Sequence, residues 1–117
     1  MTYATKANIE VTDVAVAVYF RRLVNRFFKI LPIWETGEES IYVYIQNLQI
    51  ELLGFQSMIE AIGYDADYMA LVSILQYLLD NPASEVWLVK REVFNSISLC
   101  KQLGERYGTP DQEEVPQ

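Results

Sequence analysis

The sequence predicts an all-α single domain with four principal helices in a four-helix bundle-like arrangement. Apolar residues keep helical spacing in four separate segments, and proline or glycine lies at the breaks between them. The most regular segment has three heptads of apolar residues, at Ile41, Ile45, Leu48, Leu52, Phe55, Ile59 and Ile62. This seam needs a partner surface along its whole length, either other helices of the chain or a second copy of it. We therefore expect Leu52 and Phe55 to be buried.

The length and composition are those of one soluble globular domain, with 117 residues, 51% hydrophobic and 21% charged. We expect a helical domain over 13–108, a short arm at 1–12 and a disordered acidic tail at 109–117. The longest uncharged runs, from Ile41 to Ile50 and from Tyr68 to Leu79, are too short to span a membrane. No secretion signal pattern is present, so the sequence favours a cytoplasmic protein with no membrane association.

The first helix is predicted to begin at a cap on Thr12 or Asp13 and to stop at Pro32. The arm before it reads as weakly ordered, and no strand is needed anywhere. The outer side of this helix carries a basic ridge whose three-to-four-residue spacing stacks Arg22, Arg26 and Lys29 on one face. These three residues are the candidate partner-binding residues. The alternatives are a solvated face, or neutralisation by Glu51, Glu60 or another carboxylate on a packed neighbour.

The second helix is predicted to start at a capping box formed by Thr36 and Glu39 and to end at Gly63. Gly54 lies inside it, where glycine costs about 1 kcal/mol relative to alanine. We therefore expect close approach to Gly54 by another backbone or a bulky side chain.

The third helix is predicted to be capped by Asp65, with so wide an apolar stripe that very little of it faces water. A break at Pro82 leads to the fourth helix, in which Cys100 should be a small buried apolar residue. Helices three and four read as an αα-hairpin within a bundle. A DNA-reading helix-turn-helix is the alternative, but the turn contains proline, and only Lys90 and Arg91 would meet phosphate early in the helix.

The residue types argue against most enzyme classes. The chain has one cysteine and no histidine, which excludes an internal disulfide, histidine-containing zinc sets and histidine-based triads. No set of residues assembles a nucleophile, a base and an anion site, so we expect no catalytic residues, no metal and no cofactor. The net charge of −7 opposes non-specific binding to nucleic acid, although it permits a local basic patch.

The run Tyr19–Pro32, together with Ile74–Pro82 and Val89–Phe94, resembles small uncharacterised proteins encoded by phages and integrated mobile elements of Gram-positive bacteria. The resemblance covers about three quarters of the chain. It implies a small accessory protein that acts inside a bacterial host, and it carries no assigned activity and no functional residues.

Size, acidity and surplus aromatic residues favour a non-catalytic accessory protein that acts by helix-mediated binding to another protein. A homodimer through the helix at 41–62 is one form of that association. Two alternatives stay open. One is nucleic-acid binding through helix four or the basic ridge of helix one, and the other is an acidic inhibitor or decoy of a host nucleic-acid-binding enzyme.

Overall fold

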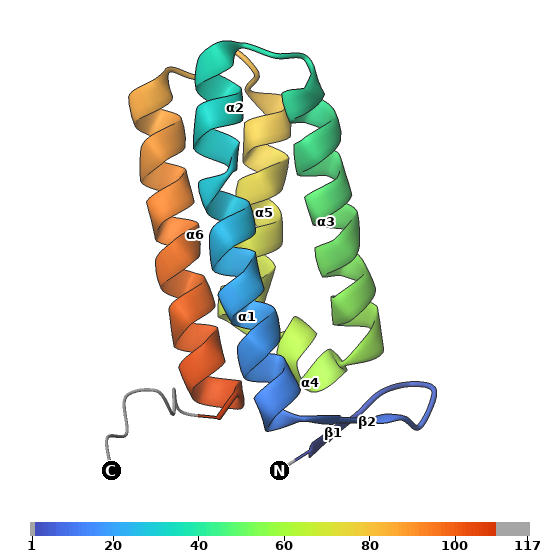
Figure 1. The fold of residues 1–117 in the computed structure, drawn as a ribbon. Helices are drawn as coiled ribbons and strands as arrows, with labels where there is room; N and C mark the ends of the chain where they lie inside the picture. The colour runs from blue at the N-terminus through green and yellow to red at the C-terminus, as the bar shows by residue number, and fades with distance from the viewer. Residues whose placement is uncertain (1, 110–117) are drawn as a thin grey trace, which may run out of the picture.

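The protein is mostly α-helical, as a computed structural model that describes residues 2–109 shows. In chain order its elements are β1 (Thr2–Ala4), β2 (Glu10–Thr12), α1 (Asp13–Phe28), α2 (Ile30–Thr36), α3 (Ser40–Met58), α4 (Glu60–Gly63), α5 (Ala66–Asp80) and α6 (Val86–Tyr107). The long helices lie side by side, and α2 continues the line of α1 (Figure 1). The predicted all-α character is confirmed in this coarse sense, apart from a small sheet at the N-terminus.

That sheet is an antiparallel hairpin, so the prediction of an arm without strands is wrong. β1 pairs with β2 in the register Thr2 to Thr12, and Asn8 in the turn has a φ of 61°, a left-handed conformation that asparagine tolerates better than most residues. Tyr3 is half-buried against the core, and its hydroxyl donates to the carbonyl of Tyr107 at 2.6 Å. The hairpin is ordered because this distant contact adds to its own backbone bonds.

α1 begins where the sequence predicts, since the hydroxyl of Thr12 accepts a hydrogen bond from the amide of Ala15 at 3.1 Å. It ends at Phe28, before Pro32, and α2 then runs through the proline. Pro32 is the third residue of α2, where a backbone N–H has no acceptor within the helix. The proline therefore removes no hydrogen bond there, and the prediction that it stops the helix is wrong.

The predicted capping box is also absent. Thr36 is the last residue of α2, and its hydroxyl donates to the carbonyl of Ile33 at 2.8 Å. α3 starts later, at Ser40, with no side-chain cap from Glu39. The threonine satisfies a carbonyl of the preceding helix and so cannot serve the following one.

The predicted second helix is interrupted at Ile59, whose backbone leaves the helical region before α4 begins. The side-chain amide of Gln56 donates to the carbonyl of Gly63 at 2.8 Å, which holds α4 folded back on α3. A Cβ on Gly63 would lie 2.3 Å from the Cα of Gln56, so only glycine fits. Gly54 differs from prediction, because nothing lies within 4 Å of the place its Cβ would occupy.

The heptad seam is covered by the chain itself. Its buried members are Ile41, Ile45, Leu48, Leu52, Ile59 and Ile62. Phe55 is only half-buried, but its ring stacks on Tyr19 with centroids 4.3 Å apart. The intramolecular alternative for this seam is therefore the one observed.

α5 begins at the predicted cap, where the carboxylate of Asp65 accepts from the amide of Asp67 at 2.8 Å. It faces water more than predicted, since Met69 and Tyr77 are exposed on its outer side. Within residues 2–109 no helix is both long and apolar enough to cross a membrane. Of the predicted tail, only Thr109 lies within the described residues.

Replacing Leu52 with aspartate should unfold the domain. The side chain is fully buried, so Leu52→Asp loses packing and also places a carboxylate in the core, together more than about 3 kcal/mol. Thermal melting followed by circular dichroism in dilute solution measures the effect. Leu53→Asp is the matched control, because Leu53 is 43% exposed and should melt within a few degrees of the parent. Equal destabilisation by both variants would contradict the assigned orientation of α3.

Candidate functional site

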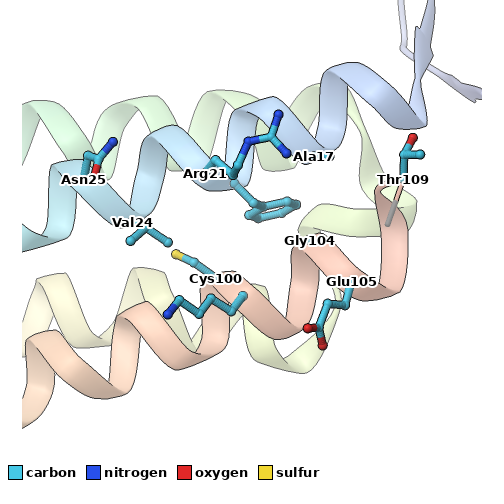
Figure 2. Close-up of a pocket in the computed structure, with 10 residues that line it drawn as sticks. Ala17, Arg21, Val24, Asn25, Cys100, Gly104, Glu105 and Thr109 are labelled. Atoms are coloured by element: carbon cyan, nitrogen blue, oxygen red, sulfur yellow. The ribbon is translucent and has the colours of Figure 1, made fainter. Parts of the chain in front are cut away.

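A groove of about 650 Å³ lies between α1 and α6. The two helices run antiparallel (Figure 1), and Figure 2 shows side chains that line the groove. Val24 of α1 and Cys100 of α6 face each other within it (Figure 2). The lining residues are Ala17, Phe20, Arg21, Val24, Asn25, Cys100, Lys101, Gly104, Glu105 and Thr109. They come from two segments about 80 positions apart in the sequence, so the site exists only in the folded chain.

The floor of the groove is apolar and closed at one end. Phe20 and Cys100 are buried beneath it. At the closed end Gly108 packs so tightly that a Cβ there would lie 2.8 Å from the Cβ of Ala17. The amide of Thr109 then donates to the carbonyl of Asp13 at 3.2 Å. This end of α6 is thereby fixed against the start of α1.

Polar groups form the rim. Arg21 and Asn25 come from α1, while Lys101 and Glu105 come from α6. No described carboxylate lies within ion-pair distance of Arg21 or Lys101. At the closed end the hydroxyl oxygen of Thr109 is buried without a hydrogen-bond partner among the described residues.

Cys100 acts here as part of the apolar floor, and its predicted burial is confirmed. Burial raises the pKa of its thiol to about 12, because the thiolate would be poorly solvated. At neutral pH the group is therefore a neutral thiol and not a nucleophile.

The charges of the chain are strongly segregated around this groove. Residues 13–29 and 86–107 together hold eight of the nine cationic residues but only three of the sixteen acidic ones, Asp13, Glu92 and Glu105. Their net charge is thus +5, while the rest of the chain carries −12. The groove therefore lies in a positive layer of an acidic protein.

The predicted partner-binding residues are divided by the fold. Arg22 and Lys29 are exposed, whereas Arg26 turns toward α3 and pairs with Glu51. The hydroxyl of Tyr44 also donates to the carbonyl of Arg26 at 2.7 Å. Neutralisation by Glu51, the alternative that the sequence left open, is thus observed for Arg26.

Sequence reasoning missed Arg21 and Lys101 as partners across a groove. The spacing of apolar residues places Arg21 on the outer side of the first predicted helix and Lys101 on the outer side of the fourth. Helical periodicity gives the face of each residue but does not say which faces of two helices meet.

The paired aspartates at the start of α5 have a structural role. Arg106 of α6 donates to Asp65 at 2.7 Å and to Asp67 at 2.9 Å, and the hydroxyl of Tyr107 also donates to Asp65. Burial alone would raise the pKa of Asp65, but these hydrogen bonds and that from the amide of Asp67 outweigh it and lower the pKa. Among residues 2–109 no group of three or more possible ligands is placed to hold a metal ion.

No protein-family profile matches the chain, and the comparisons with curated proteins and with solved structures gave no significant match. Function must therefore be inferred from the groove and the surfaces around it.

The buried thiol predicts a stability that falls at alkaline pH. An unfolded cysteine ionises near pH 8.5, whereas folding holds the proton on Cys100 up to a pKa of about 12. Below about pH 8.5 this thiol does not reduce the free energy of unfolding, because it is protonated in both states. Above that pH the unfolded thiol ionises, and the free energy of unfolding falls by up to about 1.4 kcal/mol per pH unit. Urea denaturation at pH 7 and near pH 10 should show a loss of about 2 kcal/mol from this group.

Cys100→Ala is the control for this prediction, since it removes the titrating group while adding a small cavity. Its free energy of unfolding should be lower at pH 7 but should change less between pH 7 and 10. Parallel pH profiles for the two proteins would contradict the assigned burial of the thiol.

Proposed function

We propose that this protein is a non-catalytic binding protein that holds an acidic, partly apolar segment of another protein in the groove between α1 and α6. One observation carries the proposal: in a chain of net charge −7, the layer that forms the groove has a net charge of +5. Such a field attracts carboxylates and speeds their encounter with the groove.

The chemistry of the groove suits this ligand. Val24, which is partly exposed, offers an apolar floor for an aliphatic or aromatic side chain, and Phe20 and Cys100 are buried beneath it. Arg21 on one wall and Lys101 on the other can bind carboxylates of the ligand on either side of that floor. On the rim, the carboxylate of Glu105 can accept hydrogen bonds from donors such as backbone amides of the ligand.

The binding surface extends beyond the groove along both helices. Phe28 of α1 and Phe94 of α6 meet edge to face with ring centroids 5.6 Å apart, and both are partly exposed. They add apolar surface near the C-terminal end of α1. Arg22 and Lys29 add exposed positive charge on the neighbouring face of α1, so they remain in the proposed contact surface. Arg26 contributes by its ion pair with Glu51, which ties α1 to α3.

An acidic protein segment accounts for these features better than a nucleic acid. The −12 charge of the remaining chain repels a long phosphate backbone, and Glu105 lies within the groove itself. The rings of Phe28 and Phe94 meet edge to face, so they do not present two parallel faces on which successive bases could stack.

The biological setting belongs to the same proposal. The resemblance of Tyr19–Pro32, Ile74–Pro82 and Val89–Phe94 supports an accessory protein of a phage or mobile element in the bacterial cytoplasm. The arrangement of α1 with α2, α3, α5 and α6 as four rods (Figure 1) supports classing the domain as a four-helix bundle.

Selection from a displayed random peptide library would test the binding function. We expect enrichment of peptides that combine aspartate or glutamate with apolar residues, as the groove has basic walls and an apolar floor. The double variant Arg21→Glu/Lys101→Glu should weaken a selected peptide at least about tenfold, since two charged contacts become repulsive. Fluorescence anisotropy measures the affinity.

The matched control is Lys90→Glu/Arg91→Glu, which reverses two exposed charges of α6 that do not line the groove. It lowers the net charge of the positive layer by the same amount as the groove variant. It should therefore lose only the part of the affinity that comes from the general field, and clearly less than Arg21→Glu/Lys101→Glu. Equal loss in both double variants would contradict a groove-specific site. Tight binding of single-stranded DNA, lost in Arg21→Glu/Lys101→Glu while no peptide is enriched, would replace this proposal with nucleic-acid binding.

A further inference from the structure

The outer face of α3 is exposed and carries no charge. Glu51 is the one charged residue among the 19 residues of α3, Ser40–Met58. At the chain's average of 21% charged residues, a segment of this length would hold about four. That carboxylate is ion-paired with Arg26 on the side toward α1. The exposed apolar side chains on the other side are Val43 at 56%, Ile50 at 65%, Leu53 at 43% and Met58 at 50%.

These residues lie on one uncharged strip, which also contains the exposed polar residues Gln46, Asn47 and Ser57. Val43, Ile50 and Gly54 follow each other at seven and four residues, which places them one above the other on the same helix face. Leu53 and Met58 flank this line. The space beside Gly54 is open, with no atom within 4 Å of a built Cβ. Internal packing therefore gives no reason for this glycine, whereas close approach by another helix does.

We propose that this strip is a homodimer interface, in which α3 packs antiparallel against α3 of a second copy across a two-fold axis near Ile50. A two-fold interface brings a patch against its own copy, so any charge in the patch would face a like charge. The strip has none, and it can therefore pair with itself without repulsion. A partner recruited by charge would find nothing here to recognise.

The size of the strip sets the strength of the association. A 19-residue helix is about 28 Å long, and helix-on-helix contact of this length buries less than the roughly 800 Å² per partner of a standard interface. α5 packs beside α3, joined by the Gln49 to Gln76 hydrogen bond at 3.1 Å, and Met69 of α5 is exposed. We expect a concentration-dependent dimer in exchange with the monomer.

The dimer would leave both grooves open. α3 and α6 lie at opposite edges of the domain (Figure 1). A two-fold dimer through α3 therefore presents two α1/α6 surfaces to solvent. If each binds a segment of the same partner assembly, the pair gains affinity by avidity.

Sedimentation velocity over a concentration series tests the interface. The parent should shift from 13.5 kDa toward twice that mass, while Ile50→Glu and Ile50→Lys should each remain monomeric with an unchanged circular dichroism spectrum. An equal mixture of the two variants should associate again, because the two-fold axis places glutamate opposite lysine. Val14→Glu is the matched control, since Val14 is 58% exposed on α1 and should dimerise like the parent.

Each alternative result overturns the proposal. A parent that stays at 13.5 kDa throughout removes the dimer. If Ile50→Glu still forms dimers, the interface lies elsewhere. The same holds if Val14→Glu disrupts the dimer as much as Ile50→Glu does. Failure of the mixed Ile50→Glu and Ile50→Lys proteins to associate excludes α3 against α3 at this position. None of these outcomes depends on the peptide-binding groove.

Discussion

The fold depends on satisfying the hydroxyl of Tyr68 in a dry core. Tyr68 is fully buried where α1, α3 and α5 meet. Its hydroxyl donates to the carbonyl of Leu52 at 2.8 Å and accepts from Tyr19 at 3.2 Å. Burial raises the pKa of both tyrosines, so each keeps its proton and remains a donor. An unpaired hydroxyl here would be costly, and the three helices are therefore held in one register.

This constraint also sets which face of α3 points outward. With the Leu52 carbonyl tied to Tyr68, the heptad seam turns inward and Val43, Ile50 and Gly54 turn to solvent. α3 is apolar on both sides, and one domain of this size covers only one of them. On the opposite edge α6 packs closely along α1, which creates the groove. Both proposed surfaces thus follow from the arrangement of one core.

Part of this structure could be predicted from short-range sequence patterns. The caps at Thr12 and Asp65 and the buried seam could be read from the sequence, because each depends on residues a few positions apart. The hairpin could not be predicted in this way, because it depends on the contact of Tyr3 with the distant Tyr107. The break at Ile59 could not either, because it depends on the hydrogen bond from the Gln56 side chain to the carbonyl of Gly63. The basic ridge on α1 was visible, but the rotation of the helix that pairs Arg26 with Glu51 depends on tertiary packing. For the same reason the groove between Arg21 and Lys101 was not foreseen.

The distribution of ion pairs supports the proposed binding surface on α1 and α6. Arg26 with Glu51 and Arg106 with Asp65 and Asp67 all join the positive layer to the helices behind it. The cations left without a described carboxylate within ion-pair distance all lie on the positive layer, and they are Arg21, Arg22, Lys29, Lys90 and Lys101. A surface ion pair adds at most about 1 kcal/mol, so leaving these cations unpaired has little effect on folding. It does leave them without an ion-paired carboxylate among residues 2–109, and their potential is what an acidic partner would use.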